Sequence, residues 1–336
     1  MRRVRACPLG RPGRRRRGRR IHEEESGGRR IGLQGGGQGR YGGGMKISAF
    51  TFLRNAARLQ FPFEESIRSA LPLVDEFVVA VGPSDDGTEE RVRAIGDPKI
   101  RVIPTQWNET LDGSWKVKGF IYGQQKSIAL FNCTGDWALY LEGDEVLHED
   151  DLPKIREAME RHLGNREVEA LYFKYLHFYG NGSTVAWSPR WYRREVRAVR
   201  NNIPVWGPKG LFFSVVTDYK HMRYPKAAFS GGTIYHFGWV RPEETYNAKW
   251  RGTFKHWDTG KGFQETKYAE IDPKTLRLFE GTHPAAIRGW LPPSEGIFPA
   301  NPDHVLTKRE RKNRWMMKLE KWFGWDLSRK HFTPLD

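Results

Sequence analysis

The chain has 336 residues, a formal net charge of +16 at pH 7 and a hydrophobic share of 38%. This length allows one large domain or two ordinary ones, each with a core. No stretch approaches 18 consecutive apolar residues, which excludes a membrane-spanning helix, and we expect no secretory signal because the N-terminus lacks an apolar segment. The two cysteines, Cys7 and Cys133, cannot make a disulfide framework or a cysteine metal site, so we expect a cytoplasmic protein.

Residues 1–44 differ in composition from the rest of the chain. They contain thirteen arginines, thirteen glycines and three acidic residues, and so contribute +10 of the formal charge. Such a segment buries too little apolar surface to offset its ordering entropy, and we expect it to be disordered. Clustered arginines are typical of a nucleic-acid-binding arm. A mis-set start codon in GC-rich DNA would give the same composition, and we favour this interpretation because Met45 resembles a natural start before the first strand.

From residue 45 to about 150, short apolar runs alternate with helical patterns. The apolar runs predict buried strands at 47–53, 77–81, 100–104 and 137–141. The helical patterns between them cover 63–71, 88–95 and 120–131. Strands that are apolar throughout and separated by helices pair in parallel, with both sheet faces covered. This half of the chain therefore predicts an α/β fold with a mostly parallel sheet.

The patterns after residue 150 are weaker. A charged helix is predicted from 153 to about 163, followed by an aromatic strand at 171–179. The stretch 187–257 is rich in Trp, Tyr, Arg and Gly, and it is interpreted as strands and loops of a substrate-binding half. Residues 284–304 are rich in proline and are expected to wrap the surface.

The last predicted element is a basic helix at 308–325. Its apolar side chains gather towards one side, and they are Trp315, Met316, Leu319, Trp322 and Phe323. An interfacial helix on an anionic membrane has this composition. A terminal helix docked on the catalytic core needs the same apolar stripe, so the sequence leaves both interpretations open.

Polar residues follow three of the four predicted strands, where ligands bind in an open parallel sheet. They lie at 51–55, 84–87 and 142–145. No Gly-x-Gly-x-x-Gly and no Gly-x-x-x-x-Gly-Lys-Ser/Thr pattern opens a helix, which argues against a dinucleotide-binding Rossmann site and a P-loop.

The most specific of these segments is Glu142-Gly143-Asp144-Glu145. Three carboxylates within four residues repel one another unless a cation or solvent relieves them, and Mg²⁺ and Mn²⁺ take oxygen ligands of this kind. The alternative is a solvated acidic turn.

A series of segments resembles the family-2 glycosyltransferases in order and spacing. They are 47–56, 66–69, 75–79, 84–88, 126–130 and 135–145. The resemblance covers residues 46–150 well and the remainder loosely. It implies a GT-A fold, which is a Rossmann-like, mostly parallel sheet flanked by helices, with an acceptor-side half after it. It also implies a nucleotide-diphosphate sugar donor, Mn or Mg at an Asp-x-Asp motif, and inversion at the anomeric carbon.

The resemblance also implies roles for individual residues. The nucleotide-sugar-binding residues would be Thr51, Arg54, Asn55, Asp86, Lys126 and Glu142, with Asp86 beside the base or ribose and Lys126 facing the diphosphate. Asp144 matches the metal-binding aspartate, and Glu142 replaces the first Asp of the motif. Val81 stands where many relatives have an Asp that binds the base, so uracil is a less secure expectation.

Two further roles, metal binding and general-base catalysis, are expected of residues in the second half of the chain. A lone histidine such as His236 is most often a packed core residue, but the resemblance implies that it reaches the same metal or diphosphate. An inverting transfer needs a general base near the acceptor hydroxyl. Asp218 has a similar spacing to the acidic residue of related enzymes, and Glu243 and Glu244 compete with it; each could equally be a solvent-facing carboxylate.

The aromatic residues of the second half fit a sugar or lipid-linked acceptor, or an ordinary core. Five arginines between 190 and 200 could bind an anionic acceptor or form a solvated basic face.

Our hypothesis is a cytoplasmic hexosyltransferase of cell-envelope polysaccharide type that acts on a glycan, lipid-linked or small-molecule acceptor. A peripheral contact with the membrane would be made by the last helix. The parts of the chain would be a tail at 1–44, a nucleotide-sugar-binding half at 45–150, an acceptor-side half at 151–304 and the helix at 305–336. A nucleic-acid-binding protein and an inactive glycosyltransferase-like scaffold are the alternatives. A binding module has no need of the carboxylate cluster, which would repel phosphate.

Overall fold

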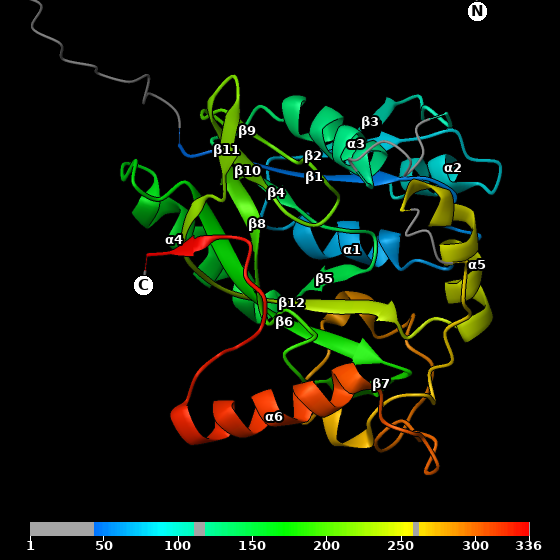
Figure 1. The fold of residues 1–336 in the computed structure, drawn as a ribbon. Coiled ribbons are helices and arrows are strands. Elements are labelled where there is room, and N and C mark those ends of the chain that lie inside the picture. The colour runs from blue at the N-terminus through cyan, green and yellow to red at the C-terminus, as the bar shows by residue number, and fades with distance from the viewer. Residues whose placement is uncertain (1–43, 111–117, 258–261, 336) are drawn as a thin grey trace, which may run out of the picture. The chain divides into compact units, whose positions relative to one another are not determined.

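A mixed β-sheet of eleven strands forms the centre of the part of the chain that the structure describes (Figure 1). This structure is a computed structural model, and it describes residues 44–110, 118–257 and 262–335. Along the main path the strand order is β13-β7-β6-β8-β4-β1-β2-β3. Strand β12 pairs with β6, and β5 and β14 pair with β12.

The first half builds the parallel part of the sheet. Its strands are β1 (Ile47–Leu53), β2 (Glu76–Val81), β3 (Ile100–Pro104) and β4 (Trp137–Tyr140). Its helices are α1 (Phe63–Ala70), α2 (Thr88–Ala94) and α3 (Phe120–Phe131). β1 pairs in parallel with both β2 and β4, and β2 pairs in parallel with β3. The predicted fold class, an α/β sheet with flanking helices, is therefore confirmed.

The continuous apolar runs are explained by two cores, one on each face of this sheet. Ala49 packs in one core with Phe63 and Ile67 of α1. Phe50, the next residue on β1, packs in the other core with Leu130 of α3. Because successive strand residues point to opposite faces and both faces are buried, these strands are apolar along most of their length.

The second half adds seven strands to the sheet, in both antiparallel and parallel pairings. They are β5 (Glu145–Leu147), β6 (Ala170–Tyr179), β7 (Asn181–Ala186), β8 (Arg194–Arg200), β12 (Lys226–Trp239), β13 (Leu276–Leu278) and β14 (Thr333–Pro334). β8 pairs antiparallel with β4 and β6, so the complete sheet is mixed. β12 pairs in parallel with β6 and antiparallel with β5, and this places His236 opposite Glu145.

The remaining elements lie outside this sheet. A three-stranded sheet contains β9 (Val205–Trp206), β10 (Ser214–Asp218) and β11 (His221–Arg223). The helices are α4 (Leu152–His162), α5 (Glu243–Thr253) and α6 (Lys308–Phe323). Short 3₁₀ turns cover Glu149–Asp151, Phe254–His256, Pro273–Thr275 and Ala285–Ile287. Within the described ranges, no helix has the length and apolar character needed to cross a bilayer.

Candidate active site

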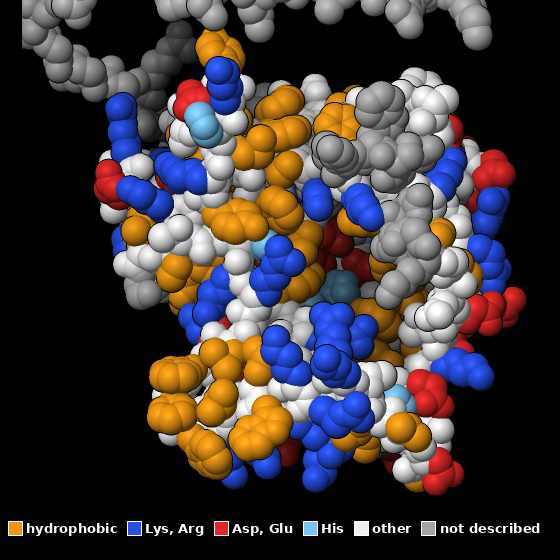
Figure 2. Space-filling model, in the orientation of Figure 1, with side chains coloured by type: hydrophobic (Ala, Val, Ile, Leu, Met, Phe, Trp, Pro, Cys, Tyr) orange, Lys and Arg blue, Asp and Glu red, His pale blue; other side chains and the backbone are white. Residues whose placement is uncertain are grey.

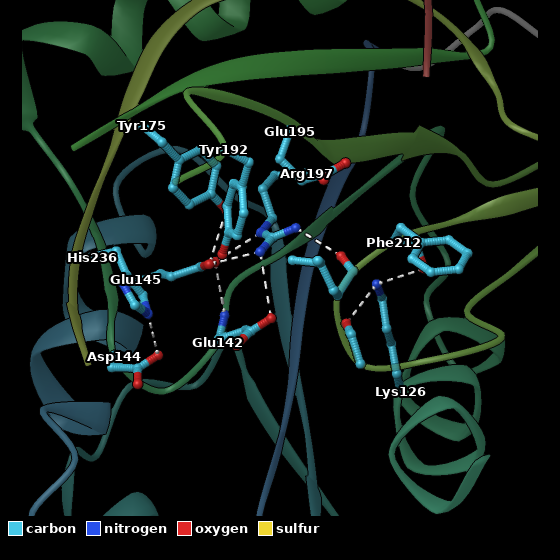
Figure 3. Close-up of polar contacts among 12 residues, drawn as sticks. Lys126, Glu142, Asp144, Glu145, Tyr175, Tyr192, Glu195, Arg197, Phe212 and His236 are labelled. Carbon is cyan, nitrogen blue, oxygen red and sulfur yellow. Dashed lines mark hydrogen bonds and ion pairs between the residues drawn. The ribbon is translucent and has the colours of Figure 1, made fainter. Parts of the chain in front are cut away.

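Acidic and histidine side chains lie at the bottom of a hollow in one face of the protein (Figure 2). Glu142 and Asp144 come from the turn between β4 and β5, and His236 comes from β12 (Figure 3). The turn lies at the carboxyl end of β4, which is the end of a parallel strand where ligands bind. Pairing of β12 with β5 then brings residues that are about 90 positions apart in sequence into one site.

Glu145 is fully buried beneath this site. Its carboxylate accepts hydrogen bonds from Arg197 Nε at 2.8 Å and Nη2 at 2.7 Å, and from Tyr175 Oη at 2.8 Å. It also accepts the backbone N–H of Glu142 at 3.1 Å. Because these contacts satisfy both oxygens, Glu145 fixes the turn and is not available to a ligand.

Glu142 is less well compensated. Its side chain is 32% exposed, and Arg197 Nη2 lies 3.4 Å from its Oε1. Burial and the neighbouring charges of Glu145 and Asp144 raise the pKa of Glu142 to about 7, against the opposing effect of Arg197. An added cation in the hollow would relieve this repulsion.

Asp144 and His236 face each other at the centre of the site. The Oδ1 atom of Asp144 lies 3.6 Å from Nε2 of His236, and the two side chains are 3% and 11% exposed. Asp144 Oδ1 is buried without a hydrogen-bond partner among the described residues. Burial opposes ionisation of Asp144, but the nearby charges of His236, Lys249 and Arg241 outweigh it and lower its pKa. The carboxylate is therefore ionised and has an unused lone pair.

A second histidine orients His236. His177 Nε2 lies 2.8 Å from the carbonyl oxygen of Tyr192, and His177 Nδ1 lies 3.1 Å from His236 Nδ1. A carbonyl only accepts, so Nε2 of His177 carries the proton, and burial keeps His177 neutral by lowering its pKa well below the usual value. Nδ1 of His177 must then accept from Nδ1–H of His236. Burial lowers the pKa of His236 against the opposing effect of Asp144, and in its neutral form the lone pair lies on Nε2, directed towards Asp144.

Gly238 keeps the space beside these two atoms open. A Cβ at this position would lie 2.8 Å from Asp144 Oδ2 and 2.8 Å from His236 Nε2. Contacts below 3.0 Å are essentially never made by real Cβ atoms. Two unprotonated donor atoms and a gap that a single methyl group would fill are features of a cation site.

The donor set fits a divalent metal that is shared with a phosphate ligand. No group of three or more His, Cys, Asp or Glu side chains suited to a metal occurs among the described residues. Asp144 and His236 supply one oxygen and one nitrogen. Mg²⁺ is commonly held by only one or two protein carboxylates, with water and substrate phosphates completing its octahedron, so two protein ligands are enough.

Orientation of His236 by His177 gives a first prediction. His177→Phe keeps a buried ring but removes the acceptor for Nδ1–H of His236, so we expect Mn²⁺ affinity to fall about 10- to 100-fold, as when an outer partner of a metal ligand is lost. His177→Gln, whose amide oxygen can accept that proton, should recover part of the affinity. Electron paramagnetic resonance of free Mn²⁺ measures it. Equal Mn²⁺ affinity of the Phe variant and the wild type would contradict the orienting role.

Four predicted nucleotide-binding residues lie at the ends of β1 and β2. Thr51 belongs to β1 itself, Arg54 and Asn55 follow it, and Asp86 lies in the loop after β2. Thr51 is buried, and its hydroxyl lacks a partner in the described part of the chain. Arg54 pairs with Glu109 and lies 5.2 Å from the ring centre of Trp107. Asn55 has a left-handed backbone, with φ of 50°, and its N–H donates to Ser84 Oγ.

Asp86 is occupied by the start of α2. Its carboxylate accepts from the backbone N–H of Arg58 at 2.7 Å, and from the N–H and hydroxyl of Thr88 at 3.1 and 2.6 Å. Burial by itself would raise the pKa of Asp86, but these hydrogen bonds outweigh burial and lower the pKa. Asp86 therefore joins the two loops that border the predicted nucleotide pocket.

Lys126, which the resemblance places on the diphosphate side, is fully buried in the structure. Its ammonium group donates to the carbonyls of Gly210 at 2.9 Å and Phe212 at 3.3 Å, and it lies 3.6 Å from the ring centre of Phe213 (Figure 3). The α3 face that carries it packs against the loop before β10. We therefore leave Lys126 out of the proposed site.

The two predicted general bases lie on different elements. Asp218 ends β10 in an exposed hairpin, where His221 Nδ1 lies 2.9 Å from its carboxylate. Glu243 begins α5, and its carboxylate accepts the backbone N–H of Tyr268. Glu244, its neighbour, is exposed. Helix α5, which begins at Glu243, also carries Lys249, whose positive charge acts on Asp144 and Glu142.

The arginines between 190 and 200 have structural partners. Arg197 and Arg200 are buried, Arg193 pairs with Glu320, and Arg194 pairs with Asp326. The aromatic residues of this half also pack largely on one another; for example, the rings of Trp191 and Trp239 are 5.3 Å apart. These two groups therefore belong mainly to the core.

Three residues of the site escaped the sequence analysis: His177, Gly238 and Lys249. His177 and His236 are direct register partners on the parallel strands β6 and β12. The sequence signal was one histidine in each of two aromatic strands. It predicts a contact between the two histidines only when the pairing of β6 with β12 is known. Gly238 and Lys249 follow His236 closely, so they could have been examined with it.

Part of this site lies in a segment that is similar to a known protein family. The family model Glycosyl transferase family 2 matches residues 62–214, which include Glu142 and Asp144 and end before His236. No curated protein matches the chain.

Several solved structures are similar to this chain. Staphylococcus aureus TarS has 14% identity and a TM-score of 0.32, with 47% of this chain and 28% of that chain covered. TarS 1–349 in complex with UDP-GlcNAc has 17% identity and a TM-score of 0.31, with 47% and 46% covered. Glucosyl-3-phosphoglycerate synthase from Mycobacterium tuberculosis, in complex with Mn²⁺, UDP and phosphoglyceric acid, has 24% identity and a TM-score of 0.28, with 41% and 45% covered. The chain thus spans less than half the length of these structures.

The family match includes the strand, the turn and the acidic residues that form one wall of the site. Residues 62–214 thus match the Glycosyl transferase family 2 model, and the described part of the chain folds as a mixed α/β sheet with flanking helices.

Proposed function

We propose that the protein is an inverting hexosyltransferase that uses a nucleotide-diphosphate sugar and Mn²⁺ or Mg²⁺. The observation that carries this proposal is the facing pair of unprotonated atoms, Asp144 Oδ1 and His236 Nε2, with Gly238 keeping the space beside them free. A metal bound there would offset the negative charge that develops on the leaving diphosphate.

The chain's own residues would position and stabilise the donor. Asp144 and His236 would hold the metal, with His177 fixing the direction of the His236 lone pair. Lys249 of α5 is partly buried, and its charge acts on Asp144 and Glu142. It would add positive charge on the side of the site where the diphosphate binds. Glu142, which is partly exposed beside Arg197, would contact the ribose or the metal.

A single displacement also needs a base that takes the proton of the acceptor hydroxyl. We propose Glu243 for this role, because its helix borders the site through Lys249, and we keep Asp218 as the alternative. The carboxylate would accept the proton as the acceptor oxygen attacks the anomeric carbon and the bond to the diphosphate breaks.

This mechanism predicts inversion of the anomeric centre. Proton NMR coupling constants of the isolated product would report its configuration. A retained configuration would remove the general-base role from both Glu243 and Asp218. Glu243→Gln should lower kcat about 10²- to 10⁴-fold, the contribution typical of a general base, and Glu244→Gln is the matched control.

The proposed acceptor is a glycan, including a lipid-linked one, of the cell-envelope polysaccharide type. We place the enzyme in the cytoplasm, since two cysteines provide no disulfide framework. The nucleic-acid-binding alternative depends mainly on residues 1–44, of which 1–43 lie outside the described residues. An inactive scaffold is disfavoured, because Asp144, His236 and the open space at Gly238 are all present.

A further inference from the structure

Helix α6 is attached to the rest of the protein through its polar side. Arg314 donates two hydrogen bonds to Asp272, at 2.7 and 2.8 Å, and Glu320 accepts two from Arg193, at 2.7 and 3.0 Å. Of the sixteen residues of the helix, those that are buried are Glu310 and Asn313. Ion pairs and a capping box at Thr307 thus hold the helix in place.

The large aromatic side chains point away from this contact. Trp315, Trp322, Phe323 and Trp325 are each 56–66% exposed, and the rings of Phe323 and Trp325 stack at 4.6 Å. Figure 2 shows hydrophobic side chains gathered at the end of α6. A helix docked by its apolar stripe would bury these residues. The structure shows the reverse, so docking on the core does not explain the stripe.

Charge distinguishes between the partners that this face could bind. The exposed basic residues of the helix are Lys308, Arg309, Arg311, Lys312, Lys318 and Lys321. Its two acidic residues are engaged elsewhere: Glu310 with His304 and Thr307, and Glu320 with Arg193. Within α6, the outer face therefore presents positive charge with no free carboxylate.

The aromatic and basic residues share one face of the helix. Positions 308, 311, 312, 315, 318 and 322 recur at the three- and four-residue spacing that places side chains together. The Nζ atom of Lys318 lies 5.1 Å from the ring centre of Trp315. Tryptophans surrounded by lysines and arginines are typical of helices that lie in the headgroup region of an anionic bilayer.

We infer that the outer face of α6, together with Trp325, binds an anionic membrane surface. The aromatic rings enter the headgroup region, and the basic side chains contact the anionic lipids. The hollow that contains acidic side chains and the hydrophobic side chains at the end of α6 are both seen on the face shown in Figure 2. The membrane contact does not depend on the proposed function.

Vesicle binding of the full chain tests this inference. Brominated phosphatidylcholine, alone or mixed with brominated phosphatidylglycerol, provides both flotation and a quencher of inserted tryptophans. We expect flotation and quenching with the mixed vesicles at low salt, and loss of both at high salt or with phosphatidylcholine alone. The basic residues 1–44 could cause flotation, but they contain no tryptophan to be quenched.

Two sets of variants assign the contact to α6. Trp315→Ser with Trp322→Ser should abolish most of the quenching and weaken binding at least about tenfold, with an unchanged Tm because both side chains are exposed. Tyr219→Ser, which alters an exposed ring on the β10–β11 hairpin, is the control and should bind as the wild type does. Unchanged quenching in the double variant, equal binding to neutral vesicles, or binding of RNA but not of vesicles would each overturn the inference.

Discussion

Replacement of Asp144 by asparagine is expected to lower donor turnover about 10²- to 10³-fold, the loss typical when a group that stabilises developing charge is removed. Asparagine keeps the size of the side chain but removes the negative charge that faces His236, Lys249 and Arg241. Without that charge, the site holds an excess of positive groups and no anionic metal ligand. Donor hydrolysis and Mn²⁺ binding, measured on the same preparation, would both report the change.

The fold should survive this substitution. The backbone carbonyl of Asp144 still accepts the N–H of Phe237 at 2.8 Å, and Oδ1 has no hydrogen bond to lose among the described residues. Asp150→Asn, at a carboxylate whose side chain is exposed, is the matched control and should keep wild-type activity. Metal-dependent donor hydrolysis that persists at the wild-type rate in Asp144→Asn would refute the role assigned to Asp144.

Substitution of Gly238 by alanine should have a comparable effect through a different cause. The added methyl group would lie 2.8 Å from both Asp144 Oδ2 and His236 Nε2, in the space proposed for the metal. Gly238 is not among the residues with positive φ, so its backbone accepts alanine without strain. Because the side chains of Asp144 and His236 must shift to admit the methyl group, the variant should fold with a somewhat lower Tm in the absence of ligand. It should lose the increase in Tm that a metal and a nucleoside diphosphate give to the wild type.

Gly252→Ala provides the control for this experiment. Gly252 lies in α5, and among the described residues no atom beyond its own helix backbone and chain neighbours lies within 4 Å of the position of an added Cβ. Alanine there should leave metal and nucleotide binding intact and raise stability slightly, because alanine favours helix more than glycine does. If Gly238→Ala binds the metal as tightly as Gly252→Ala does, the site proposed beside Gly238 is wrong.

The parallel half of the fold could be predicted because local patterns determine it. The strands at 47–53 and 100–104 and the helix at 120–131 were predicted with the bounds that the structure shows. The strand at 47–53 is largely apolar on both sheet faces, so its composition alone distinguishes it from the loops. The position of Asp144, directly after such a strand, follows from the same pattern.

The other half of the site depends on pairings between distant segments. His236 faces Asp144 because β12 pairs with β5, and His177 reaches His236 because β6 pairs with β12. β12 contains glycines and polar residues as well as aromatic ones, and its register shifts along β6, so no local pattern predicts these neighbours. Lys126 shows the same limitation. Its helix was predicted correctly, but the carbonyls that its ammonium binds belong to Gly210 and Phe212.

Helix α6 shows that amphipathicity does not determine which side of a helix is buried. Its apolar stripe was evident from the sequence, yet the contacts that attach it come from Asp272 and Arg193, far from it along the chain. Where ion pairs of this kind hold the polar side, the apolar side remains free for another partner.

Calorimetric titration of the protein with nucleoside diphosphates, in the presence and absence of Mn²⁺, tests the central claim most directly. The claim is that Asp144 and His236 hold a divalent metal together with the diphosphate. It predicts that at least one nucleoside diphosphate binds only when Mn²⁺ is present. It also predicts that this Mn²⁺-dependent binding is lost in Asp144→Asn. Equal affinity for the nucleoside diphosphates with and without Mn²⁺, or no binding of any of them in its presence, would contradict the claim.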